Sequence, residues 1–225
     1  MANVRSERAR ATRARIVDAA ADLFGSIGYA RTTMQAVADR AGVAVQTVYF
    51  VFHSKPELLS ATVEDRSAGT ADAPPVVDRT WFVEAMGAAD ARRAIGLVVD
   101  HGVDIYARVA PLAHATREAA LVDPAVDALW TRINVGRKAG MGAVVAAIHD
   151  RGQLRLGLTV ASATDICHTI LSHETYLELV QRSGWDYLRF KAWLHRTLCD
   201  LLLDPDLVAG PGLDEAVAGL SFASR

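Results

Sequence analysis

Residues 45–52 form a short segment that gathers polar and aromatic side chains at helical spacing. On the side away from the preceding helix we expect Gln46, Thr47 and Phe50, with Tyr49 and His53 near its end. Amide and hydroxyl groups can hydrogen-bond to the edges of base pairs, and the major groove of DNA is wide enough to admit an α-helix. The chemistry that this segment indicates is recognition of a DNA sequence.

The residues around this segment have the spacing of a helix-turn-helix. Ala38, Gly42 and Val48 stand at offsets 0, 4 and 10, and the apolar positions around them are Val37, Ala41, Val43 and Val51. A small residue at 38 lets two helices cross closely, and Gly42 accepts the positive φ of a sharp turn. The same spacing also fits a plain corner between two helices. Charge and helix-start signals favour the DNA-binding interpretation.

The charge of the chain is divided unevenly. Residues 1–55 hold eight Lys or Arg and four Asp or Glu, a net charge of +4, and the remaining residues carry −6. Five arginines precede the first strongly apolar stretch: Arg5, Arg8, Arg10, Arg13 and Arg15. The positive end is a candidate for binding a polyanion. The arginine run could equally be a solubilising tail.

Apolar periodicity predicts helices throughout the chain. The first is a helix of about five turns that carries an apolar stripe from Ile16 to Ile27 and stops near Gly28. The next three run from Thr32 or Thr33 to Arg40, over 45–52, and from Ser54 to Arg66. Thr32 and Gln35 have the form of a capping box, while Ser54 can cap the last of these helices with Glu57 reaching back to its amide.

The remainder is also expected to be helical after a loop at 67–80 that holds Pro74 and Pro75. The predicted helices are 90–109, stopped by Pro111, a shorter one to Leu121, then 124–152, 159–182 and 185–203, with a Gly- and Ala-rich tail from Asp206. Gly136, Gly140 and Gly142 would suit a close helix crossing. No strand alternation of useful length occurs, so the predicted fold is all-α.

The stretch ARIVDAAADLFGSIGYARTTMQAVADRAGVAVQTVYFVFHSKPELLSAT resembles the N-terminal domain of TetR-family transcriptional regulators. The shared motifs are LF-x-x-x-G-Y, TT, A-x-x-AGV, T-V-Y-x-x-F and SK-x-EL. The resemblance implies that Gln46, Thr47 and Tyr49 face DNA and that Thr33 and Lys55 contact phosphates. Two departures are Phe50-Val51, where many members have Tyr-His, and Ala44, which replaces the usual Ser cap at a cost of about 1 kcal/mol.

The predicted organisation is a helix-turn-helix three-helix DNA-binding domain at 1–55, a connecting helix at 56–66, and a helical-bundle ligand-binding and dimerisation domain at 67–225. In a TetR-like protein the last two long helices pair with their copies, so Leu194 and Leu198 are expected in a homodimer interface. The alternative is that both helices simply belong to the core of the subunit. Candidate effector-binding residues at helical spacing are His101, Ile105, His114, Trp130, Asn134, His168 and Ser172. Each also has an ordinary interpretation as a core or surface residue. A moderately hydrophobic effector with one or two polar groups would suit such a lining.

Other classes of protein are disfavoured. His173 with Glu174, or His101 with Asp104, could pair for acid–base work, but no metalloprotease, nucleophile-elbow, phosphate-loop or dinucleotide motif accompanies them. We therefore predict no enzyme, no catalytic residue and no cofactor. Two distant cysteines without a CxxC pair predict no metal site and a reduced cytoplasmic location. No apolar run is long enough to span a membrane.

The function expected from the sequence is that of a repressor that binds a palindromic operator in double-stranded DNA and is released by a small-molecule effector. The alternative is a DNA-binding protein of the same fold without such an effector, either an activator or a peptide- or protein-sensing factor. A protein of either kind would have the same type of sequence over residues 1–66, so this region does not distinguish them.

Overall fold

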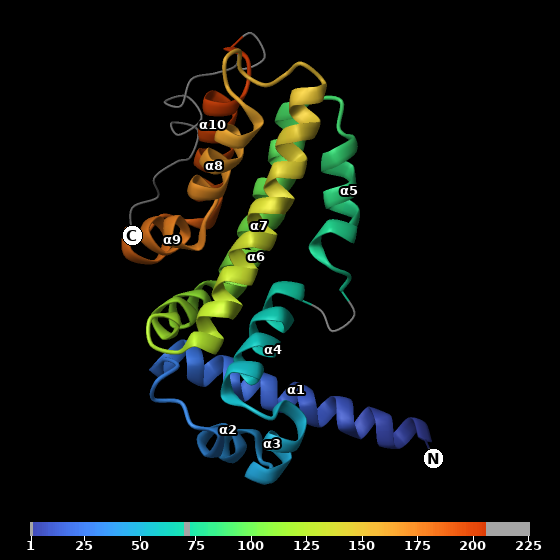
Figure 1. Ribbon diagram of the computed structural model, residues 1–225, viewed down its shortest axis with the longest axis vertical. Coiled ribbons are helices and arrows are strands. Elements are labelled where there is room, and N and C mark those ends of the chain that lie inside the picture. The colour runs from blue at the N-terminus through green and yellow to red at the C-terminus, as the bar shows by residue number, and fades with distance from the viewer. Residues whose placement is uncertain (1, 70–72, 206–225) are drawn as a thin grey trace. The chain divides into compact units, whose positions relative to one another are not determined.

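The computed structural model describes residues 2–69 and 73–205, with side chains from Ser6 onward (Figure 1). Every extended regular element within those ranges is helical, and Leu154 pairs with Leu203 only as an isolated bridge. The all-α prediction is confirmed. The predicted tail from Asp206 lies outside the described residues.

The chain divides into two compact units, which are described separately. Unit 1 comprises Met1–Asp72 and Arg108–Ile133, and unit 2 comprises Ala73–Ala107 and Asn134–Arg225. Helices α6 (Ala91–Ala120) and α7 (Pro124–Asp150) contribute residues to both units. The functional division at 1–55 and 67–225 stays a prediction.

Unit 1 is built on α1 (Ala2–Ile27), α2 (Met34–Ala41), α3 (Val45–Phe52) and α4 (Lys55–Ala68). Helix α1 packs against α2 and α4, and α2 packs against α3 (Figure 1). The buried apolar residues of α1 begin at Ile16, which is fully buried, and join one core with those of the other three helices. The predicted helix of about five turns that stops near Gly28 is found, and it is longer than expected because it continues back through the arginine run to Ala2.

The capping interactions of α2 and α4 agree only in part with those predicted from the sequence. Thr33, in extended conformation, caps α2 by accepting a hydrogen bond from the Ala36 amide at 3.0 Å. The predicted Thr32–Gln35 capping box is wrong, since the Gln35 amide donates to Asp39 instead. Ser54 caps α4 as predicted, accepting from the Glu57 amide. The Glu57 carboxylate accepts from the Ser54 hydroxyl rather than from its amide.

The segment predicted as a loop at 67–80 is shorter than expected. Helix α4 continues to Ala68 and ends at Gly69, whose φ of 79° is the left-handed conformation that glycine favours. A 3-10 turn, η1 (Val76–Asp78), then precedes α5 (Thr80–Gly87), a helix that the sequence analysis missed. Two residues of α5, Phe82 and Ala85, are buried, so tertiary packing stabilises a helix too short to stand alone.

Pro111 lies inside α6 and does not end it. A proline removes one intrahelical hydrogen bond, which is why the sequence predicted a stop there. Its neighbours Ala110 and Leu112 are almost completely buried. The continuous helix Ala91–Ala120 corrects the two predicted helices, since packing on both sides of the proline compensates for the missing bond.

Unit 2 contains α8 (Val160–Ile170), α9 (His173–Tyr176), the π-helical segment η2 (Leu177–Arg182) and α10 (Tyr187–Leu202). The predicted single helix 159–182 is therefore wrong. It breaks at Leu171, and Ser172 starts a new helix by accepting a hydrogen bond from the Thr175 amide. The predicted helices 124–152 and 185–203 are confirmed to within two residues at each end.

The glycines of α7 differ in their surroundings. A Cβ on Gly142 would lie 3.5 Å from Thr164 of α8, and one on Gly140 would lie 3.8 Å from Phe82 of α5. A Cβ on Gly136 would meet no atom of another element within 4 Å among the residues described. The close helix crossing predicted at Gly136 is thus not found.

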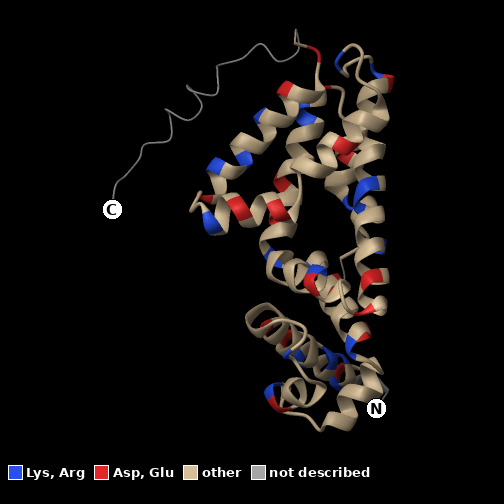
Figure 2. Ribbon diagram, turned by 60° about the vertical axis from the view of Figure 1, so that its left-hand side comes forward, with Lys and Arg blue, Asp and Glu red and all other residues tan. Residues whose placement is uncertain are grey.

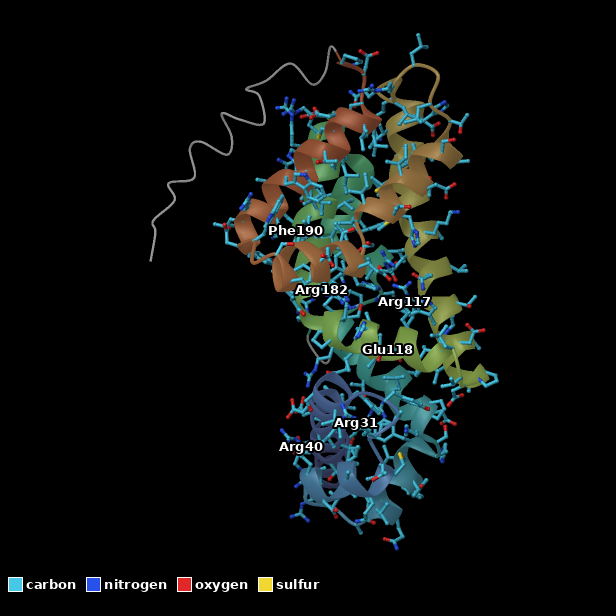
Figure 3. All side chains as sticks on the ribbon, turned by 90° about the vertical axis from the view of Figure 1, so that its left-hand side faces the viewer. Arg31, Arg40, Arg117, Glu118, Arg182 and Phe190 are labelled. Atoms are coloured by element: carbon cyan, nitrogen blue, oxygen red, sulfur yellow. The ribbon has the colours of Figure 1, made fainter. Side chains whose placement is uncertain are left out.

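Helix α10 turns its strongest apolar stripe into its own subunit. Phe190, labelled in Figure 3, and Leu194 are fully buried, and Leu198 is 1% exposed. The ring of Phe190 meets that of Tyr176 edge to face at 5.6 Å. The expectation that Leu194 and Leu198 lie in a dimer interface is wrong, because the chain already buries both of them. The exposed leucines of α10 are Leu188 and Leu201.

We predict that Leu198→Ala lowers the free energy of unfolding by about 2–5 kcal/mol, since it leaves a cavity in the core. The matched control is Leu156→Ala, because Leu156 is 94% exposed and its loss should change stability by less than about 0.5 kcal/mol. Urea unfolding followed by circular dichroism measures both. Equal losses for the two variants would contradict the burial of Leu198.

Candidate nucleic-acid interface and effector site

The turn between α2 and α3 sets the position of α3. Gly42 adopts φ 65°, and the Val43 amide donates to the Ala38 carbonyl at 3.0 Å. Ala38 and Val48 are fully buried where the two helices meet. The predicted roles of a small residue at 38, a left-handed turn at 42 and an apolar closure at 48 are all found in the geometry.

Burial of one side of α3 leaves the other side to solvent. Gln46, Tyr49, Phe50 and His53 are all exposed. Their spacing of i, i+3, i+4 and i+7 places them on one face of the helix. Phe50 is 82% exposed, an unusual state for a large aromatic side chain. We call these four residues the exposed face of α3; Thr47 lies at its edge and is half-buried.

The two ends of α3 differ from ordinary helix ends. Ala44 precedes it in extended conformation and makes no side-chain cap, as the sequence indicated. His53 ends it with φ 52°, the only non-glycine residue with positive φ in the described part of the chain. Such a backbone conformation costs about 1–3 kcal/mol. The surrounding structure therefore holds the reversal between α3 and α4 against local strain.

Thr33 and Lys55, the two expected phosphate contacts, begin α2 and α4. Thr33 is exposed, with its hydroxyl oxygen already bound to the Ala36 amide. The Lys55 ammonium lies 4.0 Å from the centre of the Tyr29 ring, and the Tyr29 hydroxyl donates to Asp123 at 3.0 Å. Burial lowers the pKa of Lys55, and the Asp123 carboxylate partly opposes this. The phosphate role of each residue stays a prediction.

Unit 2 holds a polar cluster around Arg137, a residue that the sequence analysis did not single out. Its guanidinium donates to the Asn134 side chain at 2.9 Å, the Tyr106 hydroxyl at 3.2 Å and the Leu171 carbonyl at 2.9 Å. All three acceptors are neutral, and no carboxylate pairs with Arg137 among the residues that the structure describes. The buried Nε of Arg137 and the buried Nε2 of His168 make no hydrogen bond.

The Arg137 cluster perturbs the groups beside it. Burial, together with the charges of Arg137 and His168, lowers the pKa of His173 to about 3. Burial raises the pKa of the Cys167 thiol to about 12, against the effect of Arg137. The cluster thus carries the positive charge of Arg137, and burial together with that charge favours the neutral form of His168 and His173.

The structure distributes the predicted effector residues over both units. Five belong to unit 2: His101, Ile105, Asn134, His168 and Ser172. Of these, Asn134 bonds to Arg137 and His101 stacks on Trp81 at 4.9 Å. The other two belong to unit 1, where Trp130 is half-buried and His114 is exposed and lies 3.3 Å from Glu118.

The candidate catalytic pairs have other partners or surroundings. Asp104 forms an ion pair with Lys191 at 2.8 Å rather than with His101. His173 is buried, so it is poorly placed to exchange protons with solvent. No group of His, Cys, Asp and Glu suited to a metal ion occurs within residues 2–69 and 73–205. Within the same ranges, no helix combines the length and apolar character needed to cross a membrane.

These features define an all-helical protein whose N-terminal domain is a helix-turn-helix. Residues 16–62 match the sequence model described as "Bacterial regulatory proteins, tetR family". The similarity to this family lies in that stretch of the chain. The match includes α2, α3 and their turn.

A curated relative matches this chain over a limited length. The chain is 41% identical over 58 residues to the HTH-type transcriptional regulator TtgR of Pseudomonas putida. The aligned part covers 26% of this chain and only 28% of TtgR. The similarity is thus confined to 58 residues, and the chain matches only about a quarter of the length of this relative.

Solved structures resemble the whole chain in fold. One is a complex of SmeT with triclosan, with a TM-score of 0.68 at 19% identity, covering 90% of this chain and 99% of that one. SmeT is the repressor of the Stenotrophomonas maltophilia multidrug efflux pump SmeDEF. Another is FadR of Bacillus subtilis in complex with stearoyl-CoA, with a TM-score of 0.64 at 21% identity, covering 88% of this chain and 98% of that one.

We predict different effects for two substitutions at the interface. Gln46→Ala should relax sequence preference, since an amide that pairs with adenine N6 and N7 contributes about 1–3 kcal/mol of discrimination. Lys55→Ala should weaken binding to all duplexes alike and reduce the salt slope by about one per half-site. Fluorescence anisotropy with matched and mismatched duplexes over a salt series measures both. A selective effect at Lys55 or a uniform one at Gln46 would reverse these roles.

The pKa of His173 predicts a pH dependence of stability. Because the pKa is lower in the folded chain than in the unfolded one, the unfolded state gains protons first as pH falls below about 6.5. The free energy of unfolding should therefore decrease by about 2 kcal/mol through this residue between pH 7 and pH 5. His173→Phe should flatten this part of the pH profile, whereas replacing the exposed His149 by Gln should not. An unchanged profile for His173→Phe would contradict the prediction.

Proposed function

We propose that the protein is a one-component transcriptional regulator that acts in the cytoplasm. As a homodimer it binds a palindromic operator in double-stranded DNA and represses transcription. The observation that carries this function is the exposed face of α3, held outward by the burial of Val48 and Phe52. Amide, hydroxyl and aromatic groups on one helix face match the size and hydrogen-bonding pattern of the major groove.

The proposed effector is a moderately hydrophobic small molecule with one or two polar groups. The Arg137 cluster supports this class, because two buried donor or acceptor atoms, Arg137 Nε and His168 Nε2, have no hydrogen-bond partner. Leaving such atoms unsatisfied costs about 1–3 kcal/mol each. A ligand that supplies partners would recover that free energy. The triclosan and stearoyl-CoA complexes of SmeT and FadR are consistent with effector binding in this fold.

A route from the effector to the DNA can be traced along one helix. In unit 1, Arg108 of α6 donates to the carbonyls of Arg66 and Ser67 at the end of α4. The same helix carries Tyr106, whose hydroxyl bonds to Arg137. A ligand that favours one position of α6 shifts the population of α4 positions by its differential affinity. The dimer would leave the operator if, in the favoured state, the distance between its two α3 helices no longer matched the spacing of the half-sites.

The proposed dimer uses exposed apolar residues of α10. Leu201 is 41% exposed and Leu188 is 66% exposed, which leaves apolar surface that a second copy can cover. Leu201→Glu should give folded monomers in sedimentation experiments, because a buried unpaired charge at the interface costs several kcal/mol. Since Leu201 is not part of the subunit core, circular dichroism should remain that of the parent protein. A folded dimer of Leu201→Glu would place the interface elsewhere.

Selection of bound sequences from a random duplex library tests the DNA function directly. The expected result is a palindrome whose half-site centres lie about 34–36 Å apart or a multiple of this. Tyr49→Ala combined with Gln46→Ala should abolish the enrichment without altering the fold. Failure of the parent protein to enrich any sequence would overturn the proposed function.

A melting-shift screen separates the proposed function from a regulator of the same fold without a small-molecule effector. A ligand at one hundred times its Kd adds about 2.7 kcal/mol of stability. Arg137→Gln should weaken that shift, and the effector should lower operator affinity. A stabilising ligand that leaves operator affinity unchanged would favour the activator or peptide-sensing alternative.

A further inference from the structure

The N-terminal half of α1 is largely exposed from Ser6 onward. From Ser6 to Arg15 every residue is exposed except Thr12, which is half-buried, and the first buried residue is Ile16. In Figure 1 this part of the helix runs past α3 and α4 toward the N label. We call residues 6–15 the arginine segment. Its helical form therefore owes little to burial of apolar surface.

The charges of the arginine segment are almost uncompensated. It holds four arginines and one acidic residue, Glu7. Arg8, Arg10 and Arg15 have no ion-pair or hydrogen-bond partner among the residues that the structure describes. By contrast, the C-terminal half of α1 pairs its acids with other helices of unit 1, as in Asp22 with Arg40, which is labelled in Figure 3. In unit 2, residues of both signs lie along the helices (Figure 2).

This arrangement disfavours the helix in which it occurs. The N-terminus of a helix carries a partial positive charge, so acidic residues stabilise the first turn and basic ones destabilise it. The first turn of α1 contains no acidic residue. Like charges three residues apart, such as Arg10 and Arg13, repel each other as well. An anionic partner bound along the segment would relieve this repulsion.

The arginine segment adjoins the end of α3. The Arg13 guanidinium lies 4.6 Å from the centre of the ring of Phe52, the last residue of α3. Arg10 and Arg13 share a helix face with Val17, which is buried in the core of unit 1. The side of α1 that packs on the domain core therefore continues toward the N-terminus as a row of arginines. It starts where the helix proposed to enter the major groove ends.

We propose that the arginine segment is a second DNA-binding surface, which contacts the phosphates of the duplex next to the half-site bound by α3. Arginine binds phosphate oxygens with a rigid fork of donors and keeps its charge at every physiological pH. Phosphate contacts carry no sequence information, so the segment contributes affinity and salt dependence rather than specificity. The inference rests on the proposed function for the presence of DNA, and it adds residues outside the helix-turn-helix.

The test compares two triple variants with equal loss of charge. The first is Arg8→Gln with Arg10→Gln and Arg15→Gln; glutamine has nearly the helix propensity of arginine, so α1 should persist. The matched control is Arg93→Gln with Lys138→Gln and Arg182→Gln, which changes exposed, ion-paired residues of unit 2. The probe is a random-sequence duplex of about three helical turns, ~30 base pairs. Anisotropy gives Kd between about 50 and 200 mM salt.

The first variant should show a plot of log K against log salt that is shallower by about 0.9 for each lost contact, up to about 2.7 per bound subunit. The control should keep the parent slope. An unchanged slope in the first variant, or an equal decrease in both, overturns the proposal. Binding of the parent to phosphatidylserine vesicles that the first variant loses, with an unchanged duplex slope, also overturns it and assigns the segment to a membrane surface.

The outcome for the arginine segment is separable from that for the proposed function. If the parent enriches no operator yet its duplex slope depends on Arg8, Arg10 and Arg15, the regulator function fails and the phosphate contact stands. If an operator is enriched and the slope does not depend on these arginines, the regulator function stands and the contact fails.

Discussion

The interface depends on the burial of one side of α3. A helix of eight residues is not stable by itself in water, because nucleation is costly and too few hydrogen bonds follow. Here Val48 and Phe52 supply the stabilisation by entering the core of unit 1. Their burial fixes the rotation of the helix about its axis, so Gln46, Tyr49, Phe50 and His53 must point outward. The exposed face follows from the packing.

The strain at His53 belongs to the same constraint. The chain must reverse direction between α3 and α4 within two residues, and glycine would adopt the required φ without cost. A histidine at φ 52° retains an exposed ring at the end of the helix that faces DNA in the proposed complex. Core packing on both sides, from Phe52 and from Leu58, holds the conformation. The backbone strain at His53 lowers the local stability, and the position carries a polar side chain that glycine would lack.

The sequence predicted those features that depend on residues close together in the chain. The offsets of Ala38, Gly42 and Val48 indicated the helix-turn-helix because each position has a steric requirement that only a few residue types meet. Ser54 was found as a cap for the same reason. The helix end predicted at Pro111 was wrong, because the packing that tolerates the proline comes from residues far away in sequence. The break at Leu171 was missed because Arg137 and Tyr106, which bind its carbonyl, lie more than 30 residues away.

Affinity and specificity have different sources in the proposed complex. The exposed face of α3 offers four side chains, enough to discriminate among base pairs at roughly 1–3 kcal/mol for each good contact. Such a small face leaves much of the binding free energy to phosphate contacts. Lys55 is a limited source, since its ammonium already lies over the Tyr29 ring. Arg8, Arg10 and Arg15 have no competing partner within the described residues, so their charges remain available to the phosphate backbone.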